Sequence, residues 1–247
     1  MTKFVQKFAL LVSGDPGDSL GQACERDVNL FRTILVENFG LDNRCITILE
    51  DANGATSRET LFTTLTNIAT ALNEKQSEKT LLVVQYSGHG FNVNIPNEVG
   101  EAILTSDGFV TNQDLHDKLI SKLGAHVTVF AFFDACHSEQ MFSLPYTWNA
   151  QYKVWTKVEN SDPTPILCSA YTLSACLDGQ TDQQVIGDVY GFGGALTVGF
   201  AEKVVPQLHS LEDLIDKCTS VVDIIANYIK DLGQKPILCS NKGMNHY

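Results

Sequence analysis

Apolar residues follow two different periods along this chain. Continuous apolar runs at residues 7–12, 81–86 and 127–134 predict strands that are buried on both faces of a sheet. Between them, apolar residues recur every three or four positions, which predicts amphipathic helices over 20–39 and 56–73. Because strands and helices alternate, the pattern predicts a parallel sheet with right-handed crossovers and helices on both faces.

The remaining pattern extends this arrangement to the end of the chain. We expect further strands at 45–49, 166–170 and 236–239, and further helices at 111–123, 191–204 and 211–230. Residues 91–108 are mostly polar and are expected to form a small hairpin on the rim. Residues 139–165 show no clear period and are predicted to be a long loop, which in a compact domain is usually functional or mobile.

These elements predict a single domain over residues 1–247. The fold class is α/β, a three-layer sandwich with a mostly parallel, six-stranded central sheet and helices on both faces. Thr56 and Glu59 have the spacing of a capping box, which predicts that the second helix begins there.

Polar residues follow two of the predicted buried strands. Ser87, Gly88 and His89 come after the strand at 81–86, and the strand at 127–134 is followed by Ala135, Cys136 and His137. The carboxyl ends of neighbouring strands in an open α/β sheet form the crevice where chemistry takes place. We therefore expect His89 and Cys136 to meet there.

A cysteine and a histidine at this edge predict nucleophilic catalysis. The Cys136 thiolate attacks a carbonyl, and His89 activates the thiol or protonates the leaving amine. The backbone amides of Gly90 and Cys136 are expected to hold the developing oxyanion. The sequence shows no third carboxylate that would complete a triad.

Charge and cysteine content narrow the classes of partner. The formal charge of −12 argues against nucleic acid or an anionic membrane and suits a cationic ligand. No apolar stretch is long enough to span a bilayer, and residues 1–7 lack the features of a signal peptide, so we expect a cytoplasmic monomer. The seven cysteines have no zinc-finger spacing and are expected to be reduced thiols. Those predicted to be structural are Cys45, Cys168, Cys176, Cys218 and Cys239.

The motifs YSGHG at 86–90 and DACHS at 134–138 resemble those of caspase-like cysteine peptidases, and within them the metacaspases. His89 and Cys136 lie 47 positions apart (136 minus 89), near the roughly 50 expected of a caspase-type pair. SACLDGQT at 174–181, GGALT at 193–197 and GQKPILCS at 233–240 extend the resemblance over nearly the whole chain. It implies a caspase-hemoglobinase fold, a Cys-His dyad, and hydrolysis of proteins or peptides after Arg or Lys.

The same resemblance implies a pocket for the basic P1 side chain. The residues at its positions are Asp134, Asp27 with Cys24, and Ser87. A cationic side chain that leaves water requires carboxylates beside it, which agrees with Asp27 and Asp134 in this role. We find no arginine near either motif that would instead hold a P1 aspartate.

Calcium and self-processing are further expectations. Many metacaspases hold an activating calcium ion through an acidic site that includes an Asp-Asp pair, but the matching place in this chain reads TNQD at 111–114. The chemistry itself requires no cofactor, and the candidate calcium ligands are Glu98, Glu101, Asp107, Asp114 and Asp117. Lys153 and Lys157 lie in the long loop after Cys136 and are the candidate self-processing sites.

Two other functions fit the sequence. The first alternative is a non-catalytic binding or regulatory module on the same fold. The second is a peptidase of this fold with a different P1 preference. A metal site built from His89, Cys136 and His137 is a weaker hypothesis, because these residues lack the spacing of metal ligands.

Overall fold

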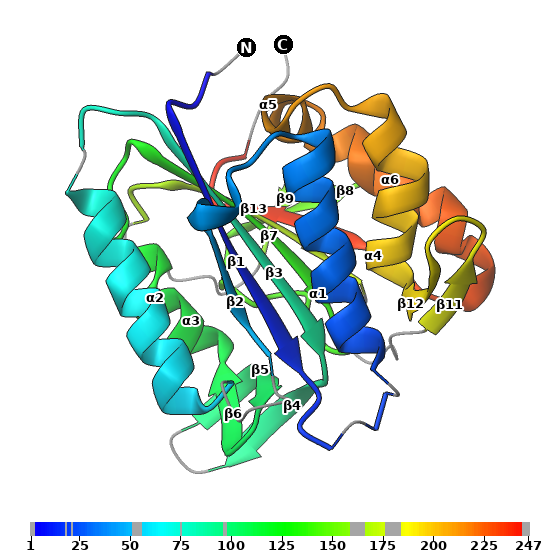
Figure 1. Cartoon of the computed structure of the whole chain (residues 1–247), viewed down its shortest axis with the longest axis horizontal. Coiled ribbons are helices and arrows are strands. Elements are labelled where there is room, and N and C mark those ends of the chain that lie inside the picture. The colour runs from blue at the N-terminus through cyan, green and yellow to red at the C-terminus, as the bar shows by residue number, and fades with distance from the viewer. Residues whose placement is uncertain are drawn as a thin grey trace.

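A single large sheet runs through the middle of the computed structural model (Figure 1). The structure describes residues 3–17, 19–20, 22–50, 56–74, 76–95, 98–158, 166–175 and 184–243. Eight strands form this sheet, in the spatial order β2 (Ile46–Leu49), β1 (Gln6–Gly14), β3 (Thr80–Gly88), β7 (Val127–Asp134), β10 (Ser169–Ser174), β13 (Ile237–Ser240), β8 (Tyr146–Asn149) and β9 (Val154–Lys157). The pairs from β2 to β10 are parallel, and β13, β8 and β9 add antiparallel pairs.

Helices cover both faces of the sheet. One face packs against α2 (Arg58–Asn73) and α3 (Asn112–Lys118), and the other against α1 (Ala23–Thr33), α4 (Ala195–Gly199), α5 (Leu211–Asp216) and α6 (Cys218–Ile229) (Figure 1). Two π-helical turns extend α1 and α4 over Ile34–Asn38 and Phe200–Val204. Short 3-10 turns occupy Asn43–Cys45, Ile120–Lys122, Val205–Gln207 and Lys230–Leu232. Each face buries its own apolar core, so the three-layer α/β prediction is confirmed.

Two small antiparallel sheets complete the fold. One contains β4 (Gly90–Ile95), β5 (Glu98–Thr105) and β6 (Gly108–Thr111), and the other contains β11 (Gln184–Gly187) and β12 (Gly191–Gly194). The strand β4 begins two residues after β3 ends. The polar stretch after β3 is therefore a three-stranded sheet, larger than the expected hairpin.

The prediction of six strands was wrong by two. The extra strands, β8 and β9, lie within 139–165, which was expected to be a loop. None of their residues is fully buried, because the hairpin forms one edge of the sheet and leaves β9 partly exposed. Strands with this mixed environment show neither a continuous apolar run nor a clean alternation, so their pattern carries no clear period.

Several element boundaries also differ from the prediction. Ser57, rather than Thr56, caps α2, since its Oγ accepts a hydrogen bond from the amide of Thr60 at 3.2 Å. The strand predicted at 166–170 is displaced to β10. The helix predicted at 191–204 begins only after β12, because the backbone of 191–194 pairs with β11 instead. The helix predicted at 211–230 is interrupted at Lys217.

Candidate active site

Sheet register places His89 beside the ends of β1 and β7. Gly88 pairs with Gly14 of β1, and Ser87 pairs with Asp134 of β7. The His89 amide donates to the carbonyl of Gly14 at 3.2 Å. Its carbonyl accepts hydrogen bonds from the Leu104 amide at 3.0 Å and the Tyr86 hydroxyl at 2.8 Å. The backbone of His89 is thus fixed on both sides of the peptide.

Cys136 lies on the turn that follows β7, where it is partly exposed. The buried Ser138 closes this turn by donating from Oγ to the carbonyl of Ala135 at 2.8 Å. Gly90 packs against the carbonyl oxygen of Cys136 so closely that a Cβ atom at Gly90 would overlap it. Only glycine fits between the histidine strand end and the cysteine turn.

A cavity of about 190 Å³ brings the predicted site residues together. His89 and Cys136 both line it, as do all four residues predicted to bind the P1 side chain, whereas Gly90 does not. The full lining consists of Leu20, Ala23, Cys24, Asp27, Ser87, Gly88, His89, Asp134, Cys136, Gln184 and Gly194. Gln184 and Gly194 come from β11 and β12 and were not predicted as lining residues.

Two carboxylates are buried in the wall of this cavity. Asp27 is 1% exposed and accepts hydrogen bonds from the Ser87 hydroxyl at 2.7 Å and the Gly194 amide at 3.1 Å. Asp134 is 2% exposed and accepts one from the Thr197 amide at 2.7 Å. Burial, followed by repulsion from Asp134, raises the pKa of Asp27 well above its usual range. A cation between the two carboxylates would stabilise their ionised forms.

The other thiols differ from Cys136 in their surroundings. Burial raises the pKa of the Cys24 thiol, so Cys24 lines the cavity as an inert side chain. Burial also raises the pKa of Cys168, Cys218 and Cys239 to about 12 in each case. Cys176 lies outside the described residues.

One residue beside His89 was missed by the sequence analysis. Asp15 Oδ1 lies 3.3 Å from Nε2 of His89, and Ser19 Oγ lies 2.7 Å from the same atom. Asp15 immediately follows β1, the strand next to β3. The signal was the turn-rich SGDPGD segment after the first buried strand, which also reaches the carboxyl edge of the sheet. The structure therefore places the carboxylate of Asp15 beside the histidine of the candidate dyad.

The candidate calcium ligands are held by protein partners. Glu101 accepts a hydrogen bond from the Gln140 amide at 2.5 Å, and Asp107 accepts one from the Arg58 amide at 2.7 Å. Asp114 forms an ion pair with Arg58 at 3.2 Å. Asp117 accepts from Gln113 at 2.9 Å, and the side chain of Glu98 lies outside the described residues.

The described members of this set do not form a cluster that could hold a metal ion. Among the described residues, no group of three or more His, Cys, Asp or Glu side chains could hold a metal. This also opposes the metal site suggested for His89, Cys136 and His137. Instead, Nδ1 of His137 lies 3.3 Å from the side-chain nitrogen Nδ2 of Asn92.

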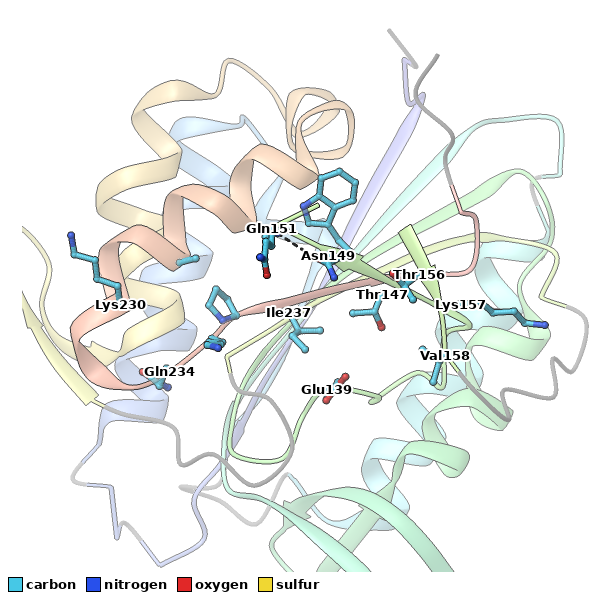
Figure 2. Close-up of a pocket in the computed structure, with 15 residues that line it drawn as sticks. Glu139, Thr147, Asn149, Gln151, Thr156, Lys157, Val158, Lys230, Gln234 and Ile237 are labelled. Atoms are coloured by element: carbon cyan, nitrogen blue, oxygen red, sulfur yellow. Dashed lines mark hydrogen bonds between the residues drawn. The ribbon is translucent and has the colours of Figure 1, made fainter. Parts of the chain in front are cut away.

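The candidate self-processing lysines both lie on the β8–β9 hairpin. Lys153 is at its exposed tip, where Nζ pairs with Asp223 of α6 at 2.6 Å. Lys157 lines a larger cavity of about 770 Å³ between the hairpin, α6 and the start of β13. Figure 2 shows the Lys157 side chain pointing away from Glu139 and Ile237. Neither His89 nor Cys136 lines this second cavity, so the candidate chemistry belongs to the smaller one.

Comparisons with known proteins identify the family of this chain. A family model described as "Metacaspase, peptidase C14 domain" matches residues 9–145. The chain belongs to the metacaspase family of cysteine peptidases, which confirms the resemblance. Within the described part of the chain, every helix is too short or too polar to cross a bilayer.

Curated relatives are similar over about half of this chain. Metacaspase-1 of Plasmodium falciparum is 28% identical over 131 residues, which are 49% of this chain and 21% of the relative. A Trypanosoma brucei protein named "Inactive metacaspase-4" is 28% identical over 146 residues, 55% of this chain and 40% of the relative. Metacaspase-1A of Aspergillus niger is 27% identical over 155 residues, which are 58% of this chain and 38% of the relative. The chain thus spans well under half the length of these relatives.

Solved structures share the fold over nearly the whole chain. Protein GSU0716 from Geobacter sulfurreducens superposes with a TM-score of 0.62 at 21% identity, covering 98% of this chain and 95% of that one. Caspase-1 from Spodoptera frugiperda gives a TM-score of 0.52 at 11% identity, covering 98% of this chain and 87% of that one. The caspase-like fold is therefore confirmed.

Proposed function

We propose that this chain is a cysteine endopeptidase that cleaves peptide bonds after Arg or Lys. Cys136 is the nucleophile and His89 is the general base and acid. The observation that carries the proposal is the single cavity in which Cys136 and His89 share the lining with the buried carboxylates of Asp27 and Asp134. Protein or peptide chains with a basic residue are the substrates.

The charge of the cavity supports a basic P1 side chain. Two buried carboxylates that repel each other are stabilised when a cation enters between them, since the desolvation of each charge is then compensated. Ser87 adds a hydroxyl beside Asp27. A volume of about 190 Å³ fits one extended side chain rather than a large ligand. A P1 aspartate would meet like charge, and an apolar residue would leave both carboxylates without compensation.

The reaction proceeds in two stages. The Cys136 thiolate attacks the scissile carbonyl carbon, and the backbone amides of Gly90 and Cys136 stabilise the oxyanion. His89 donates a proton to the leaving amine, which departs and leaves a thioester on Cys136. His89 then takes a proton from water, whose oxygen attacks the thioester and releases the carboxylic acid and the thiol.

Cleavage of fluorogenic peptides that differ only at P1 tests this proposal. We expect turnover with Arg or Lys at P1 and little with Asp, Leu or Ala. Cys136→Ala should abolish turnover, a loss above about 10³-fold, because no nucleophile remains. The matched control is Cys45→Ala, which removes a half-buried thiol outside the cavity and should retain activity.

The same assay decides between the alternatives. Turnover that survives Cys136→Ala would refute the nucleophile, and preference for another P1 residue would support the second type of peptidase. A folded chain without turnover on any peptide would support a non-catalytic binding module. Parallel assays with calcium and with chelator test calcium activation, which stays a prediction. Gel analysis of Lys153→Gln and Lys157→Gln tests self-processing in the same way.

A further inference from the structure

The carboxylate of Asp15 is held in one orientation. Its side chain is 6% exposed. Oδ2 accepts a hydrogen bond from the Leu20 amide at 2.7 Å, and Oδ1 accepts from the Ser19 amide at 3.1 Å and the Ser19 hydroxyl at 2.8 Å. Burial acts to raise the pKa of Asp15, but these hydrogen bonds and the nearby His89 outweigh it, so the pKa lies below its ordinary value. Asp15 is therefore ionised at neutral pH.

The hydroxyl of Ser19 determines which nitrogen of His89 carries the proton. A serine hydroxyl has one hydrogen, and an ionised carboxylate can only accept. The Ser19 hydroxyl therefore donates its hydrogen to Asp15. Ser19 Oγ also lies 2.7 Å from Nε2 of His89, and in that contact it can only accept a hydrogen bond. Nε2 must then be the protonated nitrogen, which leaves the lone pair of the neutral ring on Nδ1.

We propose that Asp15 is a positioning residue for His89, acting both directly and through Ser19, so that the site works as a triad. This inference rests on the proposed function, in which His89 serves Cys136. Asp15 and Ser19 hold the ring with its proton on Nε2 and present Nδ1 as the base. When Nδ1 takes the proton of the Cys136 thiol, the Asp15 carboxylate stabilises the imidazolium, as an orienting carboxylate does in serine peptidases.

The charges around the ring identify Asp15 as the main partner. The titratable groups nearest the ring are Asp15 at the end of β1, which contacts it, and four that line the same cavity: Cys24 and Asp27 of α1, and Asp134 and Cys136 at the end of β7. Asp15 is the one of these five that the structure places against Nε2, 3.3 Å away. The His89 side chain is 38% exposed, so part of the ring remains accessible to a substrate.

The pH dependence of Cys136 alkylation tests the proposal without a substrate. Iodoacetamide inactivation of the wild type, followed by mass spectrometry at Cys136, should give an acidic and an alkaline midpoint that bound the thiolate-imidazolium pair. In Asp15→Asn the alkaline midpoint should fall by about one pH unit, because the imidazolium loses its counter-charge, whereas the acidic midpoint, at which the thiol loses its proton, should not rise. Ser19→Ala should narrow the profile less. A loss of packing alone would lower the rate without moving the midpoints.

Kinetics on basic peptides provide the second readout. Asp15→Asn should lower kcat by about tenfold or more with KM little changed, since the P1 cavity is intact. The control is Asp42→Asn, which removes a surface carboxylate paired with Arg44 and should leave both midpoints in place.

Each outcome of this experiment is decisive. Unchanged midpoints in folded Asp15→Asn would overturn the proposal and leave the dyad intact. A wild type that titrates as a simple thiol, with no alkaline midpoint, would overturn the dyad and the proposal together. If Asp15→Asn does not fold, Ser19→Ala decides, because it keeps the hydrogen bonds of Asp15 to the Ser19 and Leu20 amides; unchanged midpoints there overturn the proposal.

Discussion

Under the proposed function, Asp27 would couple the binding of a basic side chain to the release of a proton. Burial and the neighbouring Asp134 both favour its protonated form. A cation in the cavity favours the ionised form instead. Binding of Arg or Lys should therefore displace a proton, and the affinity for basic peptides should increase as the pH rises towards the raised pKa of Asp27. Under the proposed function, the acidic residues of this site would determine both specificity and pH dependence.

The stability of the free protein should show the same carboxyl group. Because the pKa of Asp27 is raised in the folded state, the folded chain holds a proton that the unfolded chain releases at an ordinary aspartate pKa of about 4. The resulting stabilisation is complete below that value and is lost as the pH rises through the raised pKa. We expect the wild-type Tm to fall over this window and the Tm of Asp27→Asn to fall less. Thermal melts across pH, without ligand, measure this.

Asp27→Asn should at the same time lower kcat/KM for Arg and Lys peptides by about 10²-fold or more, because one partner of a buried charge pair is removed. The exposed Asp231→Asn serves as the control for both measurements. Parallel pH–Tm curves for wild type and Asp27→Asn would show that Asp27 does not hold the proton.

At the scale of elements, the β12–α4 junction forms one wall of the cavity. A Cβ atom at Gly193 would overlap the Asp27 carboxylate, and a Cβ atom at Gly194 would overlap that of Asp134. The Gly194 amide also donates to Asp27. Glycine at both positions lets the backbone approach the carboxylates and donate to them, which a longer side chain would prevent.

Gly194→Ala should therefore impair binding of the basic side chain. The added methyl group pushes the Asp134 carboxylate from its position, and we expect KM for Arg peptides to rise by about tenfold, with a smaller change in kcat. The matched control is Gly108→Ala in β6, where a Cβ atom has no neighbour within 4 Å. Equal KM values for the two variants would show that the junction does not shape the pocket.

At the scale of the whole molecule, the net charge of −12 surrounds a site that is itself acidic. A field of one sign attracts substrates of the opposite sign and increases their rate of encounter. This long-range effect adds to the contacts of Asp27 and Asp134. It acts on substrate residues outside the cavity as well.

Salt should therefore weaken the reaction with cationic peptides. We expect kcat/KM for a peptide with several basic residues to fall severalfold between about 0.01 and 0.5 M salt, as the screening length shortens from about 30 Å to a few Å. A peptide with a single basic P1 residue and flanking acidic residues is the control and should respond much less. Salt dependence that is equal for both peptides would exclude steering by the net charge.

The sequence by itself determined the layers of the fold and identified His89 and Cys136 as the candidate dyad. Burial on both faces appears as a continuous apolar run and burial on one face as a helical period, so β3, β7 and the main helices could be predicted locally. Strand ends that carry His89 and Cys136 meet because neighbouring parallel strands share an edge. The pocket residues Asp27 and Asp134 followed from the family resemblance, and the structure brings both to the same cavity.

Only the tertiary structure decided which side chains meet across long separations. The contact of Asp15 with His89 joins residues 74 positions apart, and that of Gly194 with Asp27 joins residues 167 apart. The partners of the candidate calcium ligands, such as Arg58 for Asp114, are also distant in the chain. A periodic pattern records how deeply a residue is buried but not which group it faces. For that reason, only the folded chain showed the Asp15 carboxylate beside His89 and the β8–β9 hairpin at the edge of the sheet.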